Sequence, residues 1–169
     1  MATLEAIKSR RSVRVFRNDP VSRDTLRELV AAGMQAPSAG NQQPWQFVVV
    51  DDRRVIMRVP EFHPYAQMSE TAPAAILVCG DMTLEQRKGY WVQDCAAATQ
   101  NILLAAHAME LGAVWTGVYP REERVAGAKK LFGLPDHIIP LALIFVGYPA
   151  EFPPMENRFR EDRVHWNAW

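Results

Sequence analysis

The sequence predicts a single α+β domain, and three observations lead to that prediction. The length of 169 residues and the apolar fraction of 49% suit one compact core. Short apolar runs typical of strands lie among segments of helical periodicity. Residues 1–169 contain no repeat, low-complexity tract or interdomain linker. We therefore expect one domain over the whole chain, with residues 147–169 as an extended C-terminal arm.

The first two predicted elements are helices. The first covers residues 3–9. The second begins at Ser22, because serine is a favourable N-cap and Val21 before it can pack on Leu26 as a hydrophobic staple. Its apolar residues keep helical spacing, and Pro37 marks its end.

Four apolar runs are expected to form strands, and they cover residues 47–50, 73–79, 114–119 and 138–146. The first run is apolar without interruption, which predicts a strand buried on both faces. Pro140 has no N–H for a ladder, so it should lie near the start of the last strand or at a sheet edge.

Two further helices complete the prediction. The longest covers residues 84–111 and is apolar on nearly all sides around its centre. Such a helix must be covered all round, so we expect part of its cover to come from a second subunit. Gly112 is placed to end it in the left-handed conformation. An exposed helix over residues 121–132 should end at Gly133.

Composition excludes several classes of function. The formal net charge of +0 argues against nucleic-acid partners or anionic membranes held by bulk electrostatics. Cys79 and Cys95 form no CxxC pair, so we expect buried thiols in a reducing compartment. The sequence shows no metal-ligand spacing, no secretory signal and no segment apolar enough to span a membrane. These features predict a cytoplasmic protein without a metal.

The most distinctive stretch is residues 36–45, Ala-Pro-Ser-Ala-Gly-Asn-Gln-Gln-Pro-Trp. Its small residues let a flat ligand approach the backbone closely, and its amides supply hydrogen bonds without charge. A second dense cluster, Arg10-Arg11-Ser12-Val13-Arg14, offers guanidinium groups that grip a phosphate. Together they indicate a site for a planar ring that carries a phosphate. Read singly, they also fit a proline-bounded turn and a solvated basic stretch.

These two segments resemble the FMN-dependent nitroreductase family, which carries Arg-x-Ser-x-Arg/Lys and Pro-Ser-x-x-Asn-x-Gln-Pro-Trp. Residues 111–118 are similar to its Leu-Gly-x-x-x-x-Gly segment. The resemblance implies a mainly antiparallel central sheet flanked by helices. It also implies a homodimer with FMN at the subunit interface and an arm, residues 147–169, that wraps the partner. The exposed tryptophans expected in that arm would be costly to leave in water.

The resemblance implies cofactor contacts from four segments: Arg10, Arg11, Ser12 and Arg14; Pro37, Ser38, Ala39 and Asn41; Thr116 and Gly117; and Arg158 and Arg160. The first segment would hold the phosphate and ribityl chain, with Arg14 at the pyrimidine edge. The second would contact the flavin of the opposite subunit. The backbone of the third would face N5, and the tail arginines would close on the phosphate.

The expected function is NAD(P)H-dependent reduction of nitroaromatics, quinones or related acceptors by a ping-pong mechanism. The flavin carries the chemistry, no side chain is expected to be catalytic, and a cation at Arg14 would stabilise the reduced ring. The expected pocket walls are Phe62, Tyr65, Met68 and Trp91, although aromatic residues at such spacings also form cores. The alternatives are a flavin-fragmenting or dehalogenating enzyme, an FMN storage protein, and a structural dimer without flavin.

Overall fold

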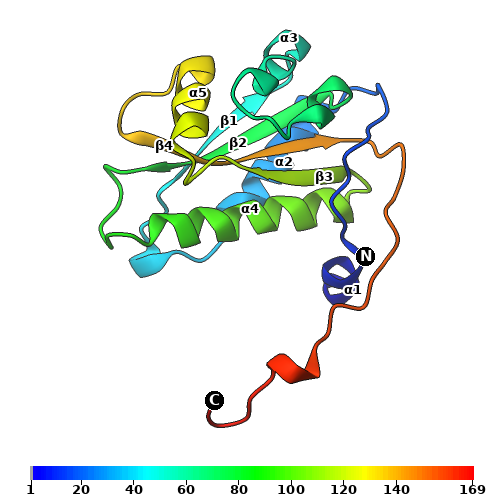
Figure 1. Cartoon of the computed structure of the whole chain (residues 1–169), viewed down its shortest axis with the longest axis vertical. Helices are drawn as coiled ribbons and strands as arrows, with labels where there is room; N and C mark the ends of the chain where they lie inside the picture. Colours follow the sequence, from blue (N-terminus) through cyan, green and yellow to red (C-terminus); the bar gives the residue numbers. More distant parts are fainter. Residues whose placement is uncertain (1) are drawn as a thin grey trace.

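The computed structural model describes residues 2–169, and its centre is an antiparallel sheet with strand order β1-β2-β4-β3 (Figure 1). The strands are β1 (Trp45–Val50), β2 (Ala74–Asp81), β3 (Gly112–Gly117) and β4 (Ile138–Gly147). The two central strands, β2 and β4, are buried almost throughout. The α+β fold and the antiparallel sheet are therefore confirmed.

Helices cover both faces of this sheet and make three layers. One face carries α2 (Arg23–Met34) and the long α4 (Trp91–Ala108), and α1 (Thr3–Ser9) lies against α4. The other face carries the short α3 (Arg53–Ile56), α5 (Glu122–Phe132) and irregular turns between them. The protein has two apolar cores, one on each face of the sheet. Because side chains alternate along a strand, β2 and β4 contribute side chains to both cores.

The strand β1 corrects one prediction. It begins at Trp45, two residues before the predicted start, and lies at an edge of the sheet rather than buried on both faces. Val49, the last residue but one of the strand, is 43% exposed. A continuous apolar run does not by itself reveal which strands lie beside it.

The region around the long helix corrects two more predictions. The helix α4 begins at Trp91, and the preceding residues 84–90 form an irregular loop. Glu110, with φ of 61°, adopts the left-handed conformation that we expected of Gly112. Gly112 instead begins β3, two residues before the predicted start of that strand, and β3 ends at Gly117. A Cβ on Gly112 would lie 2.7 Å from Cγ1 of Val13, so this glycine permits a close approach of two segments.

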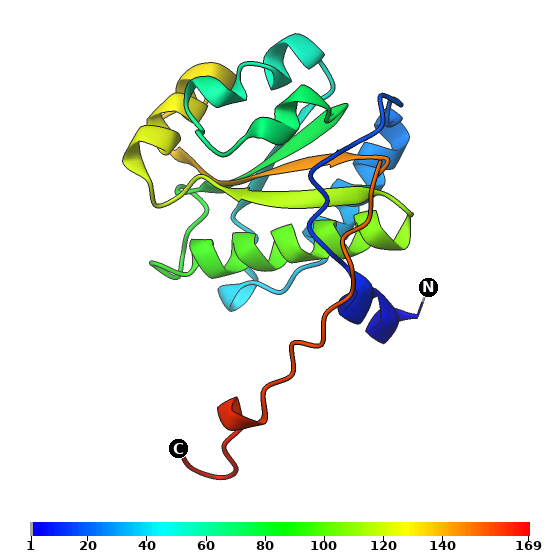
Figure 2. The ribbon, with the colours of Figure 1, turned by 45° about the vertical axis from the view of Figure 1, so that its right-hand side comes forward.

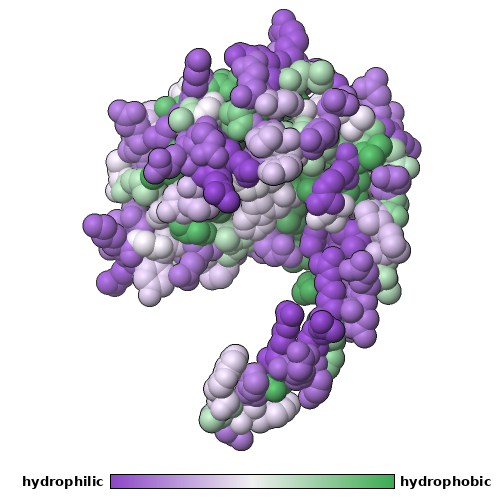
Figure 3. All heavy atoms as spheres, viewed as in Figure 1, coloured by the Kyte–Doolittle hydropathy of each residue, from purple (hydrophilic) through white to green (hydrophobic). Residues whose placement is uncertain are grey.

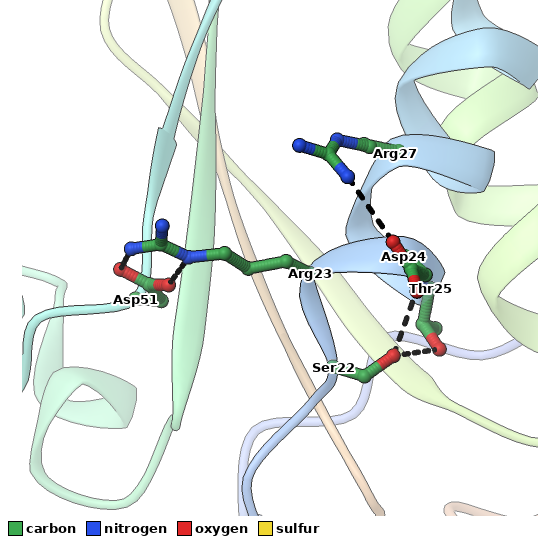
Figure 4. Close-up of polar contacts among 6 residues, drawn as sticks. All are labelled: Ser22, Arg23, Asp24, Thr25, Arg27 and Asp51. Carbon is green, nitrogen blue, oxygen red and sulfur yellow. Dashed lines mark hydrogen bonds and ion pairs between the residues drawn. The ribbon is translucent and has the colours of Figure 1, made fainter.

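Several local predictions are confirmed. Ser22 caps α2 by accepting a 3.0 Å hydrogen bond from the Thr25 amide, and Arg23 beside it pairs with Asp51 after β1 (Figure 4). Gly133 follows α5 with φ of 64°. Pro140 lies near the start of β4, beyond the stretch paired with β3 and beside an irregularity where Leu141 of β4 is the extra residue opposite Val78 and Cys79. Turn and cap chemistry was thus readable from the sequence.

Residues 12–17 lie beside the start of β3 and the start of the tail. The Val13 amide donates to the Ala113 carbonyl at 3.1 Å, and the Arg17 amide donates to the Tyr148 carbonyl at 2.8 Å. Beyond Ala150 the tail is exposed throughout and extends away from the domain (Figures 1 and 2). Trp166 is 80% exposed, and the arm stands clear of the globular body in Figure 3. Its docking on a second copy stays a prediction.

Two other expectations concern the whole chain. Within residues 2–169 no helix is long and apolar enough to cross a membrane. Cys79 and Cys95 are free and buried, as expected of small hydrophobic residues. The outer face of α4, which includes Ala96 and Leu104, is only partly buried, and its cover by a second subunit stays a prediction.

We predict that Gly112→Ala lowers the free energy of unfolding by about 1–3 kcal/mol, because the new methyl group overlaps Val13. Chemical denaturation measures the change. Adding Val13→Ala to Gly112→Ala should recover part of the loss, since it removes both γ carbons of Val13 and leaves only its Cβ in close contact. A Gly112→Ala variant as stable as the parent would contradict the close approach of these segments.

Candidate functional site

The site is built on the outer edge of β3, which no other strand covers among the described residues. The Val118 amide donates to the Leu141 carbonyl of β4 at 3.0 Å. In an antiparallel ladder successive residues point their backbone groups to opposite sides. The backbone groups of Ala113 and Gly117 therefore face the outer edge. Both carbonyls accept hydrogen bonds there, from the Val13 amide and from side chains near Gly117.

A pocket of about 210 Å³ opens at this edge. Its lining residues are Arg14, His63, Tyr65, Met68, Val114, Trp115, Thr116, Gly117 and Arg124. Five of them, from three segments of the chain, were candidates in the sequence: Arg14, Tyr65, Met68, Thr116 and Gly117. A Cβ on Gly117 would meet no atom within 4 Å, so the space beside this glycine is open.

The other two predicted pocket walls lie elsewhere. The Phe62 ring packs on Phe132 of α5, with ring centroids 6.5 Å apart. The Trp91 ring packs on Tyr119 with ring centroids 5.0 Å apart, and it fills the space beside Gly80. Both rings contribute to apolar packing and do not line the pocket on β3.

His63 and Arg124 are pocket residues that sequence reasoning missed. His63 Nδ1 accepts a 3.3 Å hydrogen bond from the Tyr65 amide, so Nε2 carries the proton and donates to the Gly117 carbonyl at 3.0 Å. Arg124 Nη1 donates to the same carbonyl at 2.9 Å. Burial lowers the pKa of His63, the hydrogen bond to the Gly117 carbonyl opposes this shift, and the nearby Arg124 charge adds to it, so the net direction is downward. An arginine in an exposed helix gives no signal in the sequence.

A second cavity of about 510 Å³ lies between the N-terminal segment and the tail. Its lining residues are Ile7, Lys8, Arg10, Arg11, Met155, Glu156, Asn157, Arg158 and Phe159. Burial lowers the pKa of Arg10, and the charges of Arg158 and Arg11 act in the same direction. Positive charge is thus concentrated here, as an anion site requires. The structure brings Arg158 to this cavity, whereas Arg160 is not among its lining residues.

Two polar residues complete this part of the site. The Arg11 guanidinium donates to the Pro154 carbonyl at 3.1 Å and to the Glu156 carbonyl at 3.2 Å, which fastens the tail to the first helix. Ser12 forms an isolated bridge with Ala113 at the β3 edge. Ser12 therefore lies between the basic cavity and the pocket on β3.

The amide loop is held by one buried carboxylate, Asp94, in the first turn of α4. Asp94 accepts from the Ala39 amide at 2.9 Å and from Gln42 Nε2 at 2.6 Å. Gln42 Oε1 in turn accepts from the amides of Gln86 and Arg87. These bonds fix the Gln42 side chain in one orientation and tie the loop to two other segments.

The loop and the basic residues lie at opposite ends of α4. Asp94 marks one end, and His107 near the other end lies 2.7 Å from Ser9 Oγ, next to the basic cluster. At about 1.5 Å per residue, these two helix positions are about 20 Å apart. One chain therefore keeps the loop apart from the basic cluster, and Pro37, Ser38, Ala39 and Asn41 are not among the residues that line the pocket on β3.

Comparison with known proteins identifies the class. The nitroreductase family model matches residues 7–81 and 63–148. A protein of Methanothermobacter thermautotrophicus, described as a candidate NADH dehydrogenase/NAD(P)H nitroreductase, is 50% identical over 169 residues, which are 100% of this chain and 88% of that protein. The chain belongs to the nitroreductase family.

Two solved structures are similar over their whole length. A candidate NADH dehydrogenase/NAD(P)H nitroreductase from Parabacteroides distasonis has a TM-score of 0.94 at 43% identity, covering 99% of this chain and 98% of that one. A candidate nitroreductase from Desulfovibrio desulfuricans, solved in complex with FMN, has a TM-score of 0.86 at 31% identity, covering 100% and 98%.

We predict that Asp94→Asn destabilises the protein by about 2–3 kcal/mol, because it replaces a charged acceptor of two hydrogen bonds. The new amide can present only one oxygen, and Gln42 cannot turn its own amide without losing the bonds to Gln86 and Arg87. Chemical denaturation measures the loss, and hydrogen exchange should quicken at the Ala39 amide.

The matched control is Asp136→Asn, which changes an exposed carboxylate by the same atoms. Its stability should stay within about 0.5 kcal/mol of the parent. Equal effects of the two substitutions would show that Asp94 does not hold the loop.

Proposed function

We propose that this chain is an FMN-dependent NAD(P)H oxidoreductase that passes electrons from NADH or NADPH to a nitroaromatic, a quinone or a related small aromatic acceptor. Its family membership and the NAD(P)H named for its relatives support the activity. The FMN in the Desulfovibrio desulfuricans structure supports the cofactor. A ping-pong order is part of the proposal, since both substrates would use the same flavin in turn.

The observation that carries the proposal is the path of residues 10–14 along the edge of β3. Arg10 lies at the basic cavity, Ser12 at the bridge to Ala113, and Arg14 at the pocket. At about 3.3 Å per residue this segment spans up to about 13 Å. A phosphate site, a polar stretch and a pocket at a strand edge thus follow in the order of the parts of FMN.

The residues present fit FMN at each part. Arg10 and Arg158 would bind the phosphate, and Ser12 would contact the ribityl chain. The Gly117 amide would face the ring, because its position on the ladder directs it to the open edge. FMN, when bound, supplies hydride and electron transfer. Arg14 would stabilise negative charge on the pyrimidine edge, and the pocket walls would exclude water.

We propose a homodimer in which the amide loop of one subunit completes the flavin site of the other. The distance along α4 between the loop and the basic cluster supports this arrangement, because one chain does not bring them together. Exposed apolar residues also support it, since Ile7 of α1 is 51% exposed and Trp169 of the arm is fully exposed. Burying them against a partner stabilises the dimer. The free buried cysteines favour a cytoplasmic location.

The direct test is anaerobic mixing of the purified protein with NADH or NADPH while the visible spectrum is recorded. We expect a flavin band that bleaches and that returns when a nitroaromatic or a quinone is added. A flavin band that persists with both donors would instead support an FMN-binding protein without this turnover. Purified protein that neither contains nor binds FMN would contradict the proposal.

We predict that Arg14→Ala lowers the midpoint potential of the bound flavin, because a cation at the pyrimidine edge favours the reduced, negatively charged ring. The expected change is roughly 30 mV, which for a two-electron couple corresponds to about 1.4 kcal/mol. Spectroelectrochemical titration measures it. Arg17→Ala is the control, since Arg17 lies on the same segment but lines a different cavity. Equal potentials in the parent and Arg14→Ala would remove Arg14 from this role.

A further inference from the structure

The pocket on β3 carries positive charge that no carboxylate neutralises. Its lining includes the guanidinium groups of Arg14 and Arg124 and no aspartate or glutamate. Within residues 2–169 neither arginine forms a salt bridge. The lowered pKa of His63 favours its uncharged form. A concave site with two guanidinium groups and no carboxylate in its lining attracts anions.

Arg124 is fixed on one side and unpaired on the other. Its Nη1 donates to the Gly117 carbonyl at 2.9 Å. Its Nε is buried and has no hydrogen-bond partner among the described residues. Because Nε has no accessible surface, a ligand would instead meet Nη2, which is not buried and has no hydrogen-bond or salt-bridge partner among the described residues. His63 shares the Gly117 carbonyl and so helps to hold the peptide to which Arg124 is attached.

Tyr65 adds an aromatic surface to the same group. The Arg124 guanidinium carbon lies 5.5 Å from the centre of the Tyr65 ring. Tyr65 is 67% exposed, so most of the ring is open to solvent or to a ligand. A flat apolar surface beside a guanidinium fits an aromatic molecule that carries an anionic group.

The two arginines reach the pocket from different directions. Arg14 belongs to the segment that we assign to FMN, and it follows Arg10 and Ser12 along the β3 edge. Arg124 belongs to α5 and approaches across the Gly117 carbonyl, beside Tyr65. We therefore assign Arg14 to the cofactor. Arg124 is then available to bind the electron acceptor beside the flavin.

We propose that Arg124 and Tyr65 form an anion subsite that selects, as electron acceptor, an aromatic molecule bearing an anionic oxygen group such as a carboxylate. This inference rests on the proposed oxidoreductase function, because it names the substrate class of the same site. The phosphates of NADH or NADPH offer the same anionic chemistry, so the experiment must separate the acceptor from the donor.

The first experiment compares benzoate with benzamide, which differ in charge and hardly in shape. Neither is reduced, and each is titrated into the FMN-loaded protein while the flavin spectrum reports binding. We expect benzoate to bind about tenfold or more tightly than benzamide, as charged hydrogen bonds are stronger than neutral ones. Equal affinities in the parent protein would overturn the proposal without any variant being needed.

The second experiment uses Arg124→Gln, with Arg124→Lys as a variant that keeps the charge and loses the planar fork. Arg124→Gln should weaken benzoate binding about tenfold and leave benzamide within about twofold. Arg124→Lys should fall between the parent and Arg124→Gln. Arg121→Gln is the matched control, because it removes the same charge at the start of α5 outside the pocket.

Kinetic measurements then show whether Arg124 acts on the acceptor, on the donor or on the flavin. With 4-nitrobenzoate and 4-nitrobenzamide as acceptors, Arg124→Gln should lower kcat/KM about tenfold for the charged acceptor only. Its reduction by NADH and NADPH and its flavin midpoint potential should match those of the parent. A loss confined to the donor reaction would assign Arg124 to the nucleotide phosphates, and a shifted potential would assign it to the flavin. Either result would overturn the acceptor subsite.

Failure of this inference can be told from failure of the proposed function. A protein that binds FMN, is reduced by NAD(P)H and turns over both acceptors equally keeps the oxidoreductase assignment and loses the anion subsite. A protein that binds no FMN loses both.

Discussion

The site depends on one constraint, the pairing of β3 with β4 on one side only. Because backbone groups alternate along an antiparallel strand, those of Ala113 and Gly117 face a side on which no other strand of residues 2–169 pairs. Different groups donate hydrogen bonds to this edge. The Val13 amide donates to the Ala113 carbonyl, and His63 and Arg124 donate to the Gly117 carbonyl. An edge that could pair with another chain thereby becomes a framework for a pocket.

The length of helix α4 determines how far apart the amide loop and the basic cluster lie. Its buried first turn holds the amide loop through Asp94, and its last turn contacts the region of the basic cluster through His107. A rigid helix of 18 residues keeps these parts of the proposed cofactor site apart. Two copies related by symmetry can bring the loop of one chain to the pocket of the other. In the proposed homodimer the exposed arm and the divided site would have one cause, since the same partner would complete both.

Much of the fold was readable from the sequence, and the parts that were missed share a physical reason. Caps and turns at Ser22 and Gly133 depend on a few neighbouring residues, so local chemistry predicted them. The edge position of β1 and the close approach at Gly112 depend on what lies next to them in space. The same holds for the site: the basic cluster is a local motif, whereas Arg124 acquires its place only when α5 packs beside Gly117. The comparisons confirm the family, and the roles of individual site residues stay predictions.

The most direct measurement of the central claim is amide hydrogen exchange in the protein with and without FMN. The account predicts that FMN slows exchange at Gly117, whose amide faces the open edge of β3. The neighbouring Val118 amide, already bonded to Leu141, should be protected in both states and serves as the internal control. FMN binding that leaves exchange at Gly117 unchanged, and slows it elsewhere, would contradict the placement of the flavin on this edge.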